Sequence, residues 1–192
     1  NPRDGLLVLG QEILETPMAW RSRYFEMHAY RSLLHEYFQA GAKWTAAPKP
    51  RLTDALYNQD YEVPGDGEPL RFSTNESEMT FDAADCVRCG RDIFAIRSNV
   101  TNEFGLEWLR RHLGDQYALH VLPTRCRQPM HIDTTFMPLA PGKALVNPEF
   151  LDVDQLPSIL KKWELRPAAR PVSNAGHIVD LSSAWLSMNV LM

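Results

Sequence analysis

The stretch PMHIDTTF, residues 129–136, contains a histidine and a carboxylate two positions apart in what the sequence predicts to be a strand. On a strand, residues i and i+2 leave the same face, so His131 and Asp133 could act on one substrate beside a cavity. The apolar neighbours Met130 and Ile132 favour this interpretation. The alternative is an amphipathic strand whose polar face points to water. Spacing alone leaves both interpretations open.

A second group of carboxylates lies in FDAAD, residues 81–85. Asp82 could accept a hydrogen bond from the ring N–H of a histidine, which would fix the tautomer and stabilise the imidazolium during a reaction. Aspartate is also favoured at helix N-caps and in turns. A structural role for Asp82 is therefore the alternative interpretation.

Cys86 and Cys89 form the motif CVRC, which would allow two thiolates to bind one metal ion. A structural zinc site normally needs four ligands, usually from a second similar pair, and only Cys126 remains in the sequence. Cys126 with His120 or His131 would complete a site only with an unusual spacing. We therefore expect no metal site and keep a zinc-binding module as the remote alternative. None of the three cysteines has a setting typical of a nucleophile.

The composition is that of a globular chain with balanced charge. The 192 residues are 44% hydrophobic, and 20 basic and 24 acidic side chains give a net charge of −4. This composition supports a sizeable core and gives no electrostatic footprint for nucleic acid or a membrane surface. No signal-peptide pattern and no apolar run near the roughly 20 residues of a membrane span occur. The odd cysteine count favours a reducing compartment, so we expect a cytoplasmic protein that acts on small molecules.

Short apolar strands alternate with amphipathic helices along the chain. Residues 45–80 are rich in Pro, Gly, Asp and Asn and predict a long loop. Thr101 is expected to cap the helix that ends before Gly114. Strands are expected at residues 6–9, 93–96, 117–122, 131–136 and 144–146, and helices at residues 17–40, 101–113 and 154–163. Units of strands plus one helix therefore recur, which predicts an α/β or α+β class; these units cover residues 6–40, 93–122 and 136–163.

Five segments resemble the amidinotransferase family, the arginine-dependent enzymes typified by glycine amidinotransferase. They are PRDGLLVLGQEILETPMAWRSRYFE (2–26), GAKWTAAPKPRLTDALYNQDY (41–61), FDAADCVRCGRDIFAIRSNVTNEFGLEWLRRHL (81–113), PMHIDTTF (129–136) and SSAWLSMNVLM (182–192). Together they follow the family's order over nearly the whole chain. The resemblance implies an α/β fold, the pentein-type propeller with five blades of ββαβ units around a central channel, of which this chain would hold about three.

The resemblance also implies a Cys–His–Asp triad. His131 matches the general acid and base of the family, and Asp82 matches the carboxylate that orients it. Asp4 and Asp133 match carboxylates that bind the guanidinium of arginine, a planar cation suited to acceptor-only groups. Arginine and an amine acceptor would be the substrates. No metal or organic cofactor is implied, and a homodimer is left open.

Further substrate contacts are implied for Met130, Ser182 and Ser183. One position departs from the glycine enzyme, in which an arginine after the Asn-Pro at 147–148 holds the acceptor carboxylate, whereas Phe150 stands here. An apolar residue at this position favours an amine without a carboxylate, or one with a hydrophobic portion. The segments HIDTTF and LPSILKKW look closest to the amidinotransferases of saxitoxin biosynthesis, which implies a toxin-pathway amine as acceptor. Glycine or an inosamine is the alternative acceptor.

We expect residues 1–192 to be an internal part of one longer amidinotransferase domain, because the chain lacks an initial methionine and stops within the apolar run LSMNVLM. The nucleophilic cysteine of the family would lie beyond this run. In the implied reaction that thiolate attacks the guanidinium carbon, and His131 protonates the departing ornithine amine before it deprotonates the acceptor amine. Cys86 and Cys89 match non-cysteine positions of the glycine enzyme and are not expected to be the nucleophile.

Overall fold

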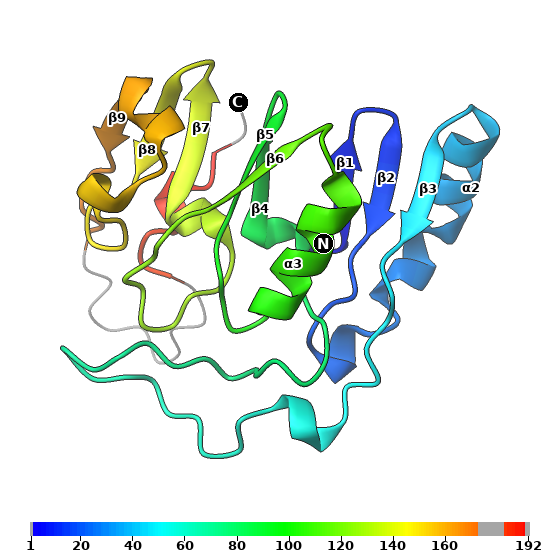
Figure 1. The fold of residues 1–192 in the computed structure, drawn as a ribbon, viewed down its shortest axis with the longest axis horizontal. Coiled ribbons are helices and arrows are strands. Elements are labelled where there is room, and N and C mark those ends of the chain that lie inside the picture. Colours follow the sequence, from blue (N-terminus) through cyan, green and yellow to red (C-terminus); the bar gives the residue numbers. More distant parts are fainter. Residues whose placement is uncertain (1, 173–182, 191–192) are drawn as a thin grey trace.

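The computed structural model describes residues 2–172 and 183–190. These residues form three separate three-stranded sheets, in the orders β1-β2-β3, β4-β5-β6 and β7-β8-β9. Figure 1 shows the three sheets side by side. The strands are β1 (Leu6–Leu9), β2 (Glu12–Glu15), β3 (Lys43–Ala46), β4 (Cys86–Cys89), β5 (Asp92–Ala95), β6 (Ala118–Val121), β7 (Phe136–Ala140), β8 (Lys143–Val146) and β9 (Glu164–Pro167).

Every sheet repeats one connection pattern. The first two strands form an antiparallel hairpin, and the third strand runs parallel to the second. Each hairpin turns at a glycine in the left-handed region, with φ of 63° at Gly10, 67° at Gly90 and 72° at Gly142. Glycine adopts this backbone without a Cβ clash, so the three glycines place the three hairpins. The recurring units predicted from the sequence are confirmed, although β2, β3, β4 and β9 were not predicted and the strand predicted over residues 131–136 meets β7 only at Phe136.

The crossover between the second and third strands differs among the units. Helix α2 (Arg31–Gln39) joins β2 to β3, and α3 (Glu103–Leu113) joins β5 to β6. The third unit uses 3₁₀ turns at Val153–Gln155 and Ser158–Lys162, so the helix predicted there is wrong. Pro157 between the two turns has no N–H to donate and prevents a continuous helix. None of the described helices is long and apolar enough to cross a membrane.

The helix predicted over residues 17–40 is shorter than expected. Only α2 is an α-helix, and 3₁₀ turns at Arg21–Arg23 and Glu26–Tyr30 precede it. Met18 has a φ of 59°, and Trp20 is extended. A right-handed helix cannot include these backbone conformations, so the apolar spacing before α2 reflects packing of turns instead.

Helix α3 has a different N-cap from the predicted one. The side-chain oxygen of Asn102, not of Thr101, accepts a hydrogen bond from the Gly105 N–H at 2.9 Å. A Cβ on Gly105 would lie only 2.1 Å from the carbonyl oxygen of Thr80. The absence of a side chain at Gly105 therefore lets α3 pack directly against the segment that leads into FDAAD.

The strand predicted over residues 131–136 is also wrong. Its first part is a 3₁₀ turn, Ile132–Thr134, and β7 begins only afterwards. His131 precedes this turn with a φ of 67°, outside the extended region. His131 and Asp133 therefore do not share the face of a strand. The 3₁₀ turn positions their side chains instead.

The central strand of the middle sheet, β5, is buried on both faces. Ile93 of β5 packs into the core shared with the first unit, and Phe94 packs into the core shared with the third unit. The two side chains enter different cores because consecutive strand residues point to opposite faces. Both are fully buried. The long loop between β3 and β4, as predicted, contains little regular structure and runs along the lower edge of the three units in Figure 1.

Candidate active site

A short turn precedes the first strand of every unit, and each turn brings in residues selected from the sequence. The four-residue helix α1 (Pro2–Gly5) contains Asp4, and Asp82 begins the turn before β4. His131 begins the turn before β7, and Asp133 lies within it. The turn before β4 packs against both of the others. The repeated unit thus brings three distant segments to one place.

Asp82 and His131 come into contact at the centre of this arrangement. The Nε2 atom of His131 lies 3.5 Å from Oδ2 of Asp82, and the two side chains are 19% and 1% exposed. The other oxygen, Oδ1 of Asp82, has no hydrogen-bond partner among the described residues. A buried carboxylate beside an imidazole can orient the ring and stabilise its protonated form.

Carboxylates surround the His131 ring. Burial alone would lower the pKa of His131, but the contact with Asp82 and the nearby charges of Asp85 and Asp4 raise it above its ordinary value. Burial raises the pKa of Asp82, while His131 and Arg23 oppose that rise. The arrangement favours the protonated ring, which is the form that a general acid needs.

Asp4 and Asp133 both accept hydrogen bonds from guanidinium groups of this chain. Oδ2 of Asp4 lies 2.9 Å from Nη2 of Arg23, and Oδ2 of Asp133 lies 2.7 Å from Nη1 of Arg3. Arg23 also approaches Asp82, at 3.7 Å. Both carboxylates therefore have the geometry to bind a guanidinium.

A cavity of about 630 Å³ opens beside His131. Its lining includes Met130, Phe150 and Ser183, three of the expected substrate contacts. Met130 exposes half of its surface. Ser182, the remaining expected contact, lies outside the described residues. The cavity thus places an apolar wall and a hydroxyl near the imidazole.

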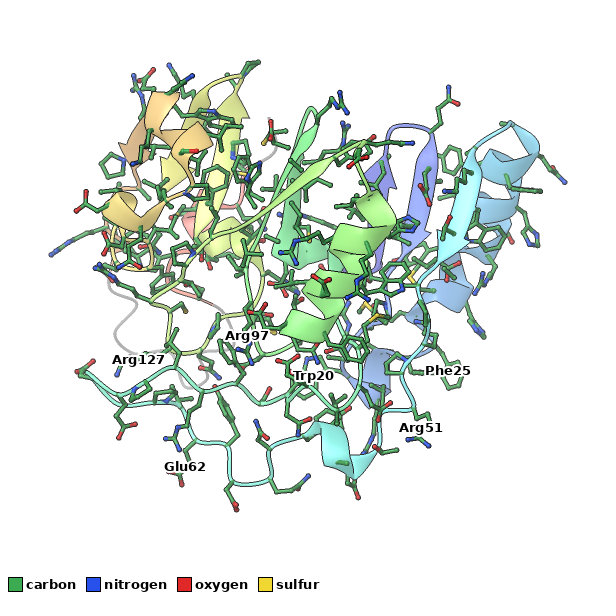
Figure 2. The ribbon with its side chains drawn as sticks, viewed as in Figure 1. Trp20, Phe25, Arg51, Glu62, Arg97 and Arg127 are labelled. Atoms are coloured by element: carbon green, nitrogen blue, oxygen red, sulfur yellow. The ribbon has the colours of Figure 1, made fainter. Side chains whose placement is uncertain are left out.

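Two aromatic side chains that were not selected from the sequence add to this wall. Trp20 and Tyr61 both line the cavity, and Trp20 stacks on Tyr57 with ring centroids 6.2 Å apart. Tyr61 belongs to the long loop, whose tip is held by an ion pair of 2.9 Å between Asp66 and Arg127. Figure 2 shows Trp20 and Arg127 on the side of the loop that faces the sheets. Trp20 and Tyr61 lie 41 positions apart in the sequence, so no local motif or spacing predicted that they would line one cavity.

Three charged residues of the site were also missed. Asp85 is the last residue of FDAAD and Arg3 precedes Asp4 directly, so both had a local signal in motifs already selected. Arg23 had none, because it reaches Asp4 from a 3₁₀ turn in a region predicted to be helical. Its role depends on the fold rather than on a motif.

Cys86 and Cys89 do not face one metal site. They stand at opposite ends of β4, and residues i and i+3 of a strand leave opposite faces. Cys86 packs in the core of the first two units, and Cys89 packs against the core of the last two. No cluster of three or more His, Cys, Asp or Glu among the described residues is placed to hold a metal ion. The structure gives the zinc-module alternative no geometric support.

Similarity to characterised proteins extends over the whole chain. It is 50% identical over 191 residues to L-arginine:L-lysine amidinotransferase of Pseudomonas savastanoi pv. phaseolicola, covering 100% of this chain and 52% of that protein. It is 50% identical over 199 residues to mitochondrial glycine amidinotransferase of Xenopus laevis, covering 100% of this chain and 47% of that protein. The resemblance to the amidinotransferases is confirmed. The chain spans about half the length of these amidinotransferases, and no family model matches it.

Solved amidinotransferase structures agree with the fold. SxtG, an amidinotransferase from Microseira wollei in the saxitoxin biosynthetic pathway, matches with a TM-score of 0.95 and 59% identity over 100% of this chain and 54% of its own. Inosamine-phosphate amidinotransferase from Streptomyces griseus matches with a TM-score of 0.84 and 40% identity over 98% of this chain and 52% of its own. DDAH from Pseudomonas aeruginosa, at 15% identity and a TM-score of 0.57, shares the fold alone. The predicted α/β propeller class is confirmed.

Proposed function

We propose that these 192 residues are part of an arginine-dependent amidinotransferase domain in which His131 and Asp82 form the acid/base pair. The proposal rests on the convergence of this pair with Asp4 and Asp133, two carboxylates paired with guanidinium groups. The 50% identity to two curated amidinotransferases over the whole chain supports it.

In the proposed reaction, Asp4 and Asp133 bind the guanidinium of arginine. A cysteine thiolate from a part of the protein beyond these 192 residues attacks the guanidinium carbon and forms a C–S bond. The C–N bond to ornithine breaks as His131 gives its proton to the departing amine, which leaves an amidino-cysteine. His131 then takes a proton from the acceptor amine, whose nitrogen forms a new C–N bond while the C–S bond breaks. Asp82 stabilises the imidazolium whenever His131 is protonated.

The cysteines present in this chain do not suit the nucleophile role. Burial raises the pKa of Cys86 and of Cys126, and it raises the pKa of Cys89 to about 11. A thiol with a raised pKa forms little thiolate near neutral pH. Cys126 lines the cavity, so Cys126→Ser in the full-length protein is the informative variant. We expect it to retain amidine transfer, and loss of the amidino adduct in this variant would instead make Cys126 the nucleophile.

Phe150 indicates the class of acceptor. Its ring lines the cavity with His131 and lies 6.4 Å from the ring of Trp185. An apolar ring gives no cation to an acceptor carboxylate, so we propose an amine without a carboxylate, of the saxitoxin-pathway type. The 59% identity to SxtG supports this choice. Glycine or an inosamine is the alternative, supported by the 50% and 40% identities to the glycine and inosamine-phosphate enzymes.

The test is to incubate full-length protein with arginine and each of several amines, and to measure both ornithine and the amidinated product. We expect the highest kcat/KM with an apolar alkyl amine that lacks a carboxylate. A preference for glycine would favour the alternative acceptor. Ornithine release that needs no amine would indicate a hydrolase and contradict the transferase proposal.

Exchange of Phe150 tests the acceptor assignment directly. We expect Phe150→Arg to improve kcat/KM for glycine by about tenfold or more, because a guanidinium can pair with the glycine carboxylate. Phe150→Leu is the matched control, since it changes shape without adding charge. Equal kcat/KM for glycine in the two variants would contradict the proposal that the residue at position 150 selects against an acceptor carboxylate.

A further inference from the structure

A second buried carboxylate, Asp85, lies behind the acid/base pair. Its side chain is completely buried and is not part of the described cavity lining. Oδ2 accepts hydrogen bonds from the Ser98 hydroxyl at 2.6 Å and from the Thr101 hydroxyl. Oδ1 accepts a hydrogen bond of 2.9 Å from the backbone N–H of His131. Burial raises the pKa of Asp85 to about 7, while the hydrogen bonds from Ser98 and Thr101 oppose that rise. Three donors around one buried carboxyl group indicate a specific role, because a buried acceptor is costly unless its hydrogen bonds are made.

The two hydroxyl groups are oriented towards Asp85 by their other contacts. Ser98 Oγ accepts hydrogen bonds from the N–H groups of Val100 and Thr101, both at 3.1 Å. Thr101 Oγ1 accepts a hydrogen bond of 3.1 Å from the backbone N–H of Asp82. Each hydroxyl has a single proton, which it donates to Asp85. The position therefore requires an acceptor for all three contacts, and an amide side chain would place a donor against one or more of them.

Asp85 thus joins both members of the pair. One connection is its direct hydrogen bond to the backbone of His131, and the other runs through the Thr101 hydroxyl to the backbone of Asp82. The φ of 67° at His131 is rare for a side chain of this size and must be held by its surroundings. The Asp82–His131 contact is long at 3.5 Å, so a small backbone shift would decide whether the groups interact.

We propose that Asp85 is a positioning residue that fixes the backbone of His131 directly and that of Asp82 through Thr101, so that the imidazole faces the Asp82 carboxylate. The inference rests on the proposed roles of His131 and Asp82. Asp85 does not touch the cavity and takes no proton from substrate in this account. It acts through the two residues that do the chemistry.

The pKa of His131 provides a readout of the positioning role that does not depend on turnover. Asp82, Asp85 and Asp4 face His131, Arg23 faces Asp82, and each of the three carboxylates raises the pKa of His131. Replacement of Asp85 by asparagine should therefore lower the pKa of His131 through the lost charge alone. Thr101→Val leaves every charge in place, so a lower pKa of His131 in this variant than in Thr101→Ser reports the loss of positioning. The pKa of His131 can be measured by NMR with ¹³C-labelled histidine in the full-length protein, with the signal assigned by its loss in a His131 variant.

The kinetic test uses Asp85→Asn with a matched control, Asp92→Asn, which replaces a carboxylate that also contacts a histidine but lies outside the site. We expect Asp85→Asn to lower kcat about 100-fold and to change KM for arginine by no more than about threefold. Asp92→Asn should leave both values near those of the wild type. A folded Asp85→Asn protein with normal kcat and an unchanged pKa of His131 would overturn the proposal.

A pair of variants at Thr101 separates positioning from folding. Thr101→Val removes the link from Asp85 to Asp82 and should lower kcat about tenfold, whereas Thr101→Ser keeps the hydroxyl and should restore it. If circular dichroism shows that Asp85→Asn does not fold, the two Thr101 variants test the positioning role instead. Equal kcat in Thr101→Val and Thr101→Ser would contradict the proposal. If the wild type transfers no amidine, the proposed function fails, and the pKa of His131 then decides the positioning role: it should be lower in Thr101→Val than in Thr101→Ser, and equal values would contradict the proposal.

Discussion

Among the residues that the structure describes, two histidines contact aspartates, and the shorter contact lies away from the site. His120 Nε2 is 2.8 Å from Asp92 Oδ1, whereas His131 Nε2 is 3.5 Å from Asp82 Oδ2. The Asp92–His120 pair joins neighbouring strands β5 and β6 of one sheet, and both side chains are more than a fifth exposed. The Asp82–His131 pair joins two units, and its carboxylate is buried.

The proposed site is therefore distinguished by the convergence of several charged groups on one histidine, rather than by a short histidine–aspartate distance. The His120 ring stacks on Phe94 at 5.2 Å and contacts one aspartate among the described residues. His131 faces three carboxylates and a cavity. A partly exposed pair contributes little to stability, while a buried pair with several charged neighbours can have an altered pKa suited to proton transfer. The two pairs therefore provide matched variants for separating catalysis from structure.

Replacement of the histidines should give the largest contrast. We expect His131→Ala in the full-length protein to lower kcat by about 1,000-fold or more, because general acid and base functions are both lost. His120→Ala removes a similar side chain and should leave kcat within about threefold of the wild type. Steady-state ornithine release measures both. Comparable losses in the two variants would mean that His131 has no special role.

Replacement of the aspartates should give the next contrast. We expect Asp82→Asn to lower kcat by about 100-fold or more, since the amide cannot stabilise the imidazolium as the carboxylate does. Asp92→Asn should have little effect on turnover. Circular dichroism should show both variants folded. Near-normal turnover in Asp82→Asn would remove Asp82 from the acid/base pair.

The guanidinium-binding carboxylates should affect binding more than the chemical step. We expect Asp133→Asn to raise KM for arginine by about 10- to 100-fold, because a charge-assisted hydrogen bond is replaced by a neutral one. Asp152 is the matched control, since it pairs with Arg125 at an exposed position away from the cavity lining. If Asp133→Asn and Asp152→Asn had the same KM, arginine binding at Asp133 would be contradicted.

The smallest expected effect is on stability as a function of pH. The pKa of His131 is raised in the folded protein, so protonation of its ring stabilises the fold fully below the unfolded value of about 6.5. This contribution should disappear as the pH rises through the higher folded value. Urea unfolding of the wild type and His131→Gln from pH 5.5 to 9 measures it. The difference in free energy of unfolding should decrease with pH, and a difference that increases would contradict the raised pKa.

Much of the fold could be predicted because the repeated unit has local signals. The apolar strands predicted at residues 6–9, 93–96 and 144–146 depend on nearby residues and match β1, β5 and β8, whereas their hairpin partners β2 and β4 were not predicted. The helix expected before α2 was wrong because positive φ at Met18 follows from tertiary packing that spacing does not encode. The N-cap of α3 was misplaced by one residue because Thr101 and Asn102 are both good caps, and Thr101 is engaged by Asp85.

The site could be predicted where a motif contained its residues. His131 and Asp82 were selected from PMHIDTTF and FDAAD, yet the assumed strand geometry at His131 was wrong. The contact between these motifs depends on packing of turns that lie 49 positions apart. Arg23 and Tyr61 enter the site only through that packing, so no motif or spacing connects them to it.

In the proposed reaction His131, oriented by Asp82, carries the proton in amidine transfer. The most direct measurement is the intact mass of full-length protein after rapid mixing with arginine in the absence of an amine. We predict that the wild type and His120→Ala gain one amidino group as ornithine is released, and that His131→Ala forms this adduct at least about 1,000-fold more slowly. Formation of the adduct by His131→Ala at the wild-type rate would contradict the claim.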